Sequence, residues 1–160
     1  MKVETISNEY KAIFSRNIGV MSESDQKKLR ESCIAIAGMG GVGGLLAERL
    51  IRLGVGHLKI TDPGYFEKSN LNRQLYSSTR NLNQNKAEVL YSHLKDINPE
   101  ADIDWSDTGI KNVQDANAFT NTQVEVTPML PWTCLPANSY SRFPLPHMMI
   151  AYAEGGCKKQ

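Results

Sequence analysis

The side chains of this sequence that could do chemistry together lie between residues 62 and 86. A carboxylate, Asp62, is followed by an arginine, Arg73, and a lysine, Lys86, with the amides Asn70 and Gln74 between them. An arginine binds phosphate oxygens through paired N–H groups, a lysine supplies a compact positive charge, and amides orient a sugar or water. An acidic side chain at the end of a strand accepts hydrogen bonds from a ribose. These residue types predict a site for a nucleoside phosphate.

A glycine-rich segment ahead of these residues indicates the same kind of ligand. Gly38, Gly40 and Gly43 follow the spacing G-x-G-x-x-G, and Gly41 lies inside the motif. Glycines let the backbone turn tightly and approach phosphates, whose charge is met by free N–H groups at the start of the next helix. A tight turn without a ligand is the alternative. The strand, helix and acidic residue expected around the motif favour a nucleotide.

The elements that must position these residues follow from hydrophobic periodicity. An apolar run at residues 33–37 is typical of a buried strand, residues 45–53 have helical spacing, and a second strand at 57–61 ends on Asp62. We expect an α/β, Rossmann-like three-layer fold with a mainly parallel sheet. The later elements predicted are a polar functional loop at 63–85, a helix at 86–97, a strand at 101–105, a helix at 112–120 and a strand at 123–127.

Three segments are expected along the chain: a helical N-terminal segment at 1–32, a nucleotide-binding α/β domain at 33–127 and an irregular proline-rich tail at 128–160. In the first segment Ser24 is expected to cap a second helix that runs through Leu29. One apolar face of this segment is predicted to consist of Tyr10, Ile13, Phe14 and Ile18. The tail is too rich in proline for regular periodicity, although residues 148–152 form a short apolar piece.

The site residues resemble a known family, the ThiF/MoeB/HesA-type adenylyltransferases, which are related to the ubiquitin-activating enzymes. The glycine motif alone is a weak signal, and it becomes strong when joined to the later residues. The resemblance spans about residues 10 to 120. It is carried by Gly38-Met39-Gly40-Gly41-Val42-Gly43, Asp62, Ser69-Asn70-Leu71-Asn72-Arg73-Gln74 and Asn85-Lys86-Ala87.

The resemblance implies an ATP-dependent adenylyltransferase with ATP and Mg²⁺ as cofactors. It would activate a carboxylate, the C-terminal glycine of a ubiquitin-like sulfur carrier protein. ATP would place its phosphates over 38–43 and its ribose at Asp62, with Arg73 and Lys86 stabilising the transferring phosphate and Asn70 and Gln74 orienting it. The family also implies a homodimer.

Arg16 stands where the family has an arginine that reaches into the dimer partner's ATP site. A solvated side chain without such a role is the alternative reading. Arginine suits the proposed role because its guanidinium stabilises phosphate charge.

The sequence departs from the family in three places. Gly64 stands where the family often has a second acidic residue, so the ribose contact rests on Asp62. No aspartate suited to magnesium follows residues 124–126, and Glu125 lies outside the expected pattern, so the metal ligand is left unassigned. The family's zinc-binding C-x-x-C pairs are missing. The fold is therefore expected to be incomplete at the C-terminus, through truncation or a shifted reading frame.

Composition excludes several classes of protein. A net charge of +1 gives no reason to expect nucleic-acid or membrane attraction. No apolar run is long enough to cross a membrane, and no signal peptide is recognisable at the start. Three cysteines without C-x-x-C spacing argue against a disulfide framework or a structural zinc site, and they suit a reducing cytoplasm.

Three alternatives remain open at the level of sequence. The first is the family branch that activates threonylcarbamoyladenosine on tRNA, which the near-neutral charge does not favour. The second is an NAD-dependent oxidoreductase, which explains the glycines and Asp62 but gives no role to residues 69–74. The third is a non-catalytic nucleotide-binding remnant, which the missing aspartate would fit.

Overall fold

The fold is built around a four-stranded sheet with the strand order β3-β2-β1-β4. The computed structural model describes residues 6–111, 113–120 and 149–153. Strands β1 (Cys33–Ala37), β2 (His57–Thr61) and β3 (Asp102–Ser106) run parallel, and β4 (Met149–Ala153) pairs with β1 in the antiparallel direction. This confirms the expected α/β fold with a mainly parallel sheet.

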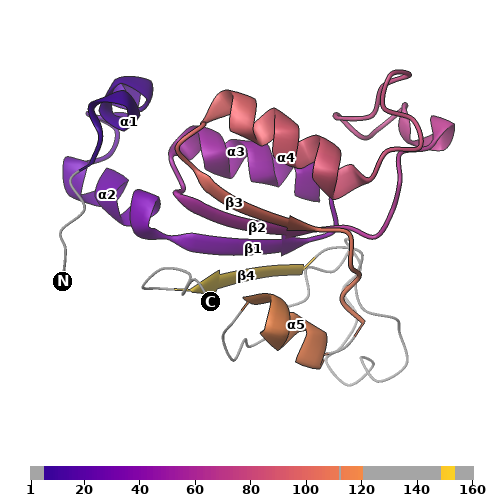
Figure 1. The fold of residues 1–160 in the computed structure, drawn as a ribbon. Coiled ribbons are helices and arrows are strands. Elements are labelled where there is room, and N and C mark those ends of the chain that lie inside the picture. Colours follow the sequence, from indigo (N-terminus) through magenta and orange to yellow (C-terminus); the bar gives the residue numbers. More distant parts are fainter. Residues whose placement is uncertain (1–5, 112, 121–148, 154–160) are drawn as a thin grey trace, which may run out of the picture.

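Two long helices cover one face of this sheet, as Figure 1 shows: α3 (Gly43–Leu53) and α4 (Lys86–Ile97). The hydrophobic core lies between them and the strands, and continuous apolar strands are typical of parallel sheets buried under helices. The buried members of the core are Ile36, Met39, Ala47, Ile51, Leu58, Ile60, Ala87, Leu90, Leu94, Ala101 and Ile103. The predicted bounds of β1, β2 and α4 are confirmed, and α3 begins two residues earlier than its periodicity indicated.

The N-terminal helices α1 (Asn8–Ile13) and α2 (Glu23–Glu31), with the short 3-10 helix η1 (Ser15–Asn17), pack at the end of α3 that is remote from the glycine turn. The Tyr10 hydroxyl donates a hydrogen bond to the carbonyl oxygen of Gly54 at 2.5 Å. The Asn17 amide donates to the carbonyl of Leu53 at 3.3 Å. These contacts fasten α1 and η1 to the C-terminal end of α3.

Two predictions for this segment are wrong. The cap of α2 is Ser22, whose side chain accepts from the backbone N–H of Asp25, and not Ser24. Tyr10 and Phe14 are buried as expected, but Ile13 and Ile18 are 41% and 45% exposed. The chain leaves helical geometry at Phe14, so a four-member helical face cannot continue through Ile18.

Within the expected irregular tail, residues 149–153 form the strand β4, close to the apolar piece predicted at 148–152. This strand covers the edge of β1, because Cys33 lies opposite Ala153 and Ala37 opposite Met149. Among the described strands, the edges of the sheet are therefore β3 and β4. The strand predicted at 123–127 and the rest of the tail lie outside the described residues.

The expectation against disulfides is wrong for Cys33, a buried residue of β1 that is disulfide-bonded. Helix α5 (Val113–Thr120) follows β3 and lies on the other side of the sheet from α3 and α4 in Figure 1. Across the described part of the chain, no helix is both long and apolar enough to cross a membrane.

Candidate nucleotide-binding site

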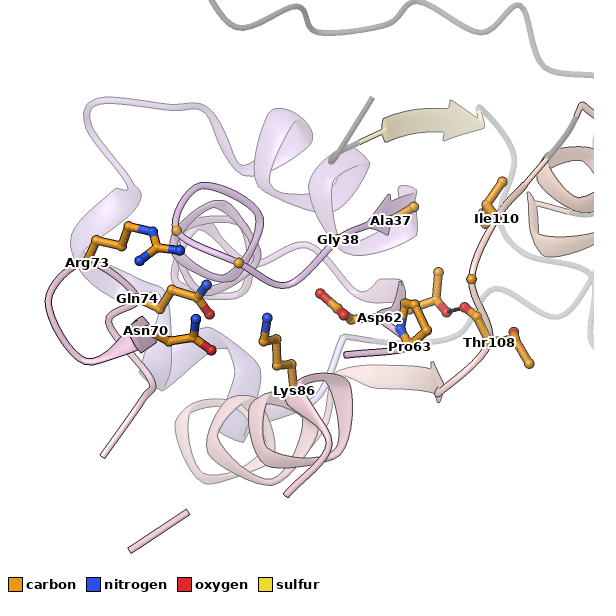
Figure 2. Close-up of a pocket in the computed structure, with 14 residues that line it drawn as sticks. Ala37, Gly38, Asp62, Pro63, Asn70, Arg73, Gln74, Lys86, Thr108 and Ile110 are labelled. Carbon is orange, nitrogen blue, oxygen red and sulfur yellow. Dashed lines mark hydrogen bonds between the residues drawn. The ribbon is translucent and has the colours of Figure 1, made fainter. Parts of the chain in front are cut away.

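A cavity of about 590 Å³ lies at the carboxyl ends of the three parallel strands, where open α/β sheets bind ligands. Its volume falls within the range of small-molecule and cofactor pockets. It brings together eight of the predicted site residues, several of which Figure 2 labels: Gly38, Gly40, Gly41, Asp62, Asn70, Arg73, Gln74 and Lys86. Segments far apart in the sequence thus converge on one site.

The glycine turn is held against the end of β2. Gly38 has a φ of +95°, which favours glycine, and its N–H donates to the carbonyl of Thr61 at 2.8 Å. The next side chain, Met39, is buried in the core, and its backbone N–H donates to Asp62 Oδ2 at 2.6 Å. Burial of Met39 and these two hydrogen bonds fix the turn that leads into α3. Among the described residues no side chain caps the N-terminus of α3. The N–H of Gly44 donates to the carbonyl of Gly40, but the N–H groups of Gly43 and Leu45 have no acceptor there, so they are available to an anion.

The carboxylate of Asp62 is buried and already accepts two backbone N–H groups. Besides Met39, the N–H of Gly64 donates to Oδ1 at 2.7 Å. A carboxylate has about four acceptor positions, so two hydrogen bonds leave capacity for a ligand hydroxyl. Asp62 therefore positions the glycine turn and still lines the cavity.

Lys86 is the first residue of α4 and its ammonium points into the cavity, as Figure 2 shows. The preceding residue, Asn85, holds it there, because the Asn85 amide donates to the carbonyls of Asp62 and Gly64 while its oxygen accepts from Ala87 and Glu88. Lys86 is half-buried, and its ammonium has no hydrogen-bond or ion-pair partner among the described residues. A half-buried cation at a helix N-terminus is electrostatically unfavourable unless an anion is bound beside it.

Arg73 lies on the wall of the cavity opposite Asp62 and is exposed. Its Nη1 donates to the carbonyl of Ser69 at 2.7 Å and to the Asn72 side chain at 3.0 Å. Arg73 forms no ion pair with the neighbouring Glu67, whose carboxylate accepts instead from Ser69 and from the backbone of Asn70. The other guanidinium nitrogens have no partner among residues that the structure describes, so they can bind phosphate oxygens.

Two amides complete this wall. Asn70 is buried, and its Oδ1 accepts from the backbone N–H of Glu67 at 3.0 Å. This hydrogen bond gives Asn70 a structural role in the turn at residues 67–70. Gln74 is buried, and its Oε1 has no hydrogen-bond partner within the described ranges. Its Nε2 would lie 3.7 Å from a side chain placed at Gly40. An orphaned buried oxygen at the edge of a cavity fits a site whose ligand or water supplies the missing donor.

A polar cluster behind the wall joins the loop to the two helices. The Tyr76 hydroxyl donates to Glu48 Oε2 on α3, and His93 Nε2 on α4 lies 3.3 Å from the same oxygen. Hydrogen bonds lower the pKa of the Glu48 carboxyl from 4.5 to about 2. The bond from Tyr76 has the largest effect, followed by those from Arg52 and His93. Burial, followed by the bond to Glu48, raises the pKa of the Tyr76 hydroxyl. The pair thus consists of a neutral phenol and an ionised carboxylate at neutral pH.

Two predicted residues do not line the cavity. Gly43 is buried as the first residue of α3. Arg16 is exposed in η1, next to Asn17, which bonds the far end of α3. Helix α3 has 11 residues and so spans about 16 Å. Arg16 is therefore remote from the cavity of its own chain.

The sequence prediction missed the side of the cavity that follows β3. Thr108, Gly109 and Ile110 line it, together with Ala37 and Pro63. The Thr61 hydroxyl donates to the carbonyl of Thr108, which ties this segment to the end of β2. These residues could have been predicted from the order of the strands. The carboxyl ends of parallel strands lie at one edge of the sheet, so residues that follow a third parallel strand lie beside the site.

The residues present fit a nucleotide better than they fit a metal ion. Asp62 is the one carboxylate among the residues lining the cavity. No group of three metal-ligating side chains occurs in the described ranges. Glu125, and the position where the resemblance would place a magnesium ligand, lie outside those ranges.

The fold and the cavity define a nucleotide-binding α/β protein. Comparison with known families assigns it further: residues 14–126 match the ThiF family, so the chain belongs to that family. Its described residues form part of the adenylation domain shared by E1-like and MoeB-type proteins.

Among curated relatives, tRNA threonylcarbamoyladenosine dehydratase of Bacillus subtilis is 36% identical over 90 residues, covering 56% of this chain and 35% of the relative. Ubiquitin-like modifier-activating enzyme 5 of Bombyx mori is 32% identical over 117 residues, covering 72% and 29%. A structure of the E. coli tRNA N6-threonylcarbamoyladenosine dehydratase TcdA in complex with ATP superposes with a TM-score of 0.69 at 26% identity, covering 73% of this chain and 48% of that one. The chain spans about a third of the curated relatives that it matches and about half of the solved structure.

Proposed function

We propose that this chain binds ATP and takes part in activating a carboxylate by adenylation. The observation that carries the proposal is the ammonium of Lys86, which has no partner in the described part of the chain and faces the glycine turn from a half-buried position. A triphosphate bound there supplies the missing negative charge. It also meets the uncapped N-terminus of α3 and the free N–H groups of Arg73.

The two ends of the cavity differ in a way that suits the two ends of ATP. Figure 2 shows the cationic and amide side chains at one end, Ala37, Pro63 and Ile110 toward the other, and Asp62 between them. In the proposed orientation the base lies against the apolar end, the ribose meets Asp62 and the phosphates lie beside Lys86.

The proposed reaction needs positioning and charge neutralisation more than a protein nucleophile. A carboxylate oxygen of the acceptor attacks the α-phosphorus, and the bond from that phosphorus to the bridging oxygen breaks. Pyrophosphate leaves, and an acyl adenylate is formed. Arg73 and Lys86 stabilise the charge that develops on the phosphate oxygens, and Gln74 orients the group that transfers. A Mg²⁺ ion would neutralise phosphate charge further.

The proposed acceptor is the C-terminal glycine of a ubiquitin-like sulfur carrier protein. The similarity to ubiquitin-like modifier-activating enzyme 5 supports this choice. A homodimer is proposed from the family resemblance, and Arg16, exposed and remote from the cavity of its own chain, is accessible to a second copy.

A second candidate is activation of threonylcarbamoyladenosine on tRNA. The similarity in sequence and fold to dehydratases of that name favours it. The net charge of +1 opposes it, since binding to RNA usually requires a basic surface.

Two experiments test the proposal. Titration calorimetry should show ATP binding more tightly than NAD, because NAD offers fewer phosphate charges for Arg73 and Lys86. Equal or tighter binding of NAD would contradict it. ATP–pyrophosphate exchange should then be stimulated by a sulfur carrier protein and not by tRNA bearing threonylcarbamoyladenosine, while the reverse result would select the second candidate. ATP binding without exchange from either acceptor would indicate a nucleotide-binding remnant.

A further inference from the structure

Helix α3 presents two residues to one aromatic ring. Gly44 and Glu48 lie one turn apart on the same face of the helix, and Tyr76 packs against both. A Cβ at position 44 would lie 3.0 Å from Tyr76 Cδ2 and 3.1 Å from Cε2, closer than ordinary side-chain contacts. The glycine run therefore includes a residue outside the G-x-G-x-x-G pattern whose missing side chain makes room for a tyrosine.

Glu48 is held as an anion by groups from three elements. Besides the Tyr76 hydroxyl, Arg52 on α3 donates to Oε1 at 2.6 Å, and His93 on α4 approaches Oε2. The Tyr76 ring also lies 4.9 Å from the His93 ring, centroid to centroid. The carboxylate is buried and well satisfied, so the hydroxyl that bonds it is strongly fixed.

Tyr76 belongs to a chain of turns that carries the phosphate-side wall of the cavity. The N–H groups of Arg73 and Gln74 both donate to the carbonyl of Asn70, at 3.1 and 2.9 Å. After Tyr76, the Asn81 amide donates to the Tyr76 carbonyl at 2.7 Å. Because Tyr76 follows Gln74 by two residues, a displacement of the tyrosine side chain would act on this wall through the backbone.

We propose that Tyr76 is a positioning residue. Its ring packs against Gly44 and its hydroxyl is hydrogen-bonded to Glu48, and together these contacts set the separation between the glycine turn and residues 70–74. The inference rests on the proposed function, because that separation matters only if phosphates bind between the two walls. Tyr76 does not line the cavity itself, so its effect passes through Arg73 and Gln74.

The chain offers a matched control. Tyr76 and Tyr91 both pack against the hydrophobic core, but the Tyr91 hydroxyl makes no hydrogen bond among the described residues. Tyr76→Phe and Tyr91→Phe remove the same atom, and they should differ only through the bond to Glu48. Gly44→Ala is a second perturbation, which pushes on the ring and leaves the hydroxyl in place.

The first measurement is hydrogen exchange of the ligand-free chain. Tyr76→Phe and Gly44→Ala should raise the exchange rate of the backbone N–H groups in 67–81, whereas Tyr91→Phe should leave that segment unchanged. Equal exchange in all variants would overturn the inference whether or not the chain binds ATP.

The second measurement separates the phosphate side from the nucleoside side. Tyr76→Phe should weaken the binding of inorganic tripolyphosphate and of ATP about fivefold and leave the binding of adenosine unchanged. A fivefold loss is smaller than the full contribution of a hydrogen bond to a charged group, because Tyr76 acts on the phosphates indirectly. Equal losses for adenosine would indicate general destabilisation and contradict the positioning role. A wild-type chain that binds neither tripolyphosphate nor ATP would overturn the proposed function, and the exchange result would still decide the role of Tyr76.

Discussion

The carboxylate of Asp62 accepts a hydrogen bond from the backbone N–H of Met39 at 2.6 Å, which joins the end of β2 to the turn that follows β1. The two residues are 23 positions apart, and the bond shapes the turn over which phosphates are proposed to lie. Asp62 therefore has two roles that can be separated: it supports the glycine turn, and it is proposed to bind a ribose.

Asp62→Ala should weaken the binding of inorganic tripolyphosphate as well as of ATP, because the N–H of Met39 in the glycine turn loses its hydrogen-bond acceptor. We expect a loss of about tenfold or more for each ligand, as for removal of a charged acceptor from a buried N–H group. Titration calorimetry with both ligands measures it. If only ATP is weakened, Asp62 acts through the ribose and the support of the turn is dispensable. Asp62→Asn retains one acceptor oxygen and should give a smaller loss.

Lys86→Met should weaken the binding of ATP about tenfold or more. The melting temperature of the ligand-free protein should stay the same or rise. The physical reason is that the ammonium has no partner among the described residues, so its removal breaks no hydrogen bond or ion pair of the unliganded fold. Lys27→Met, on the exposed side of α2, makes the same change in net charge and should leave ATP affinity as it is. A fall in melting temperature with intact ATP affinity would show that Lys86 is structural.

Gly54→Ala should destabilise the fold by about 2 kcal/mol or more, by positive-φ strain combined with steric overlap. Gly54 has a φ of +98°, and a Cβ there would overlap Gln26 Nε2 and lie 2.5 Å from the Tyr10 hydroxyl oxygen. Gly19→Ala is the control, because Gly19 has a φ of +108° with nothing within 4 Å of a Cβ. It should cost about 1 kcal/mol, the strain alone. Urea denaturation measures both, and equal costs would show that the overlap is relieved without penalty.

The stability of the fold should depend on Glu48 at acid pH. Hydrogen bonds lower the pKa of its carboxyl in the fold to about 2, against 4.5 in its ordinary state. The resulting stabilisation is fully present above pH 4.5 and is lost as the pH falls from there to about 2. The contribution is on the order of 2 kcal/mol, and Glu48→Gln should remove it at neutral pH and flatten the curve of unfolding free energy between pH 5 and 2. Parallel curves for the two proteins would contradict the assignment.

The sequence by itself determined the elements and the chemical character of the site. The bounds of β1, β2 and α4 follow from local apolar runs and from Lys86 opening a helix that ends before Pro99. The family was also recognisable from residues 38–43, 69–74 and 85–87, which are short and contiguous. Such features depend on neighbours along the chain, and hydrophobic periodicity reports those neighbours directly.

Tertiary structure decided which of these residues share a cavity and what holds them. Several contacts join segments that are remote in sequence. They are the hydrogen bond from Met39 to Asp62, the packing of Tyr76 against Gly44, the side of the cavity formed by Thr108, and the pairing of β4 with β1. The placement of Arg16 at the far end of α3 was likewise invisible to local periodicity. Contacts of this kind arise when parallel strands bring their carboxyl ends to one edge and helices pack over them, so they depend on the packed sheet and not on any local pattern.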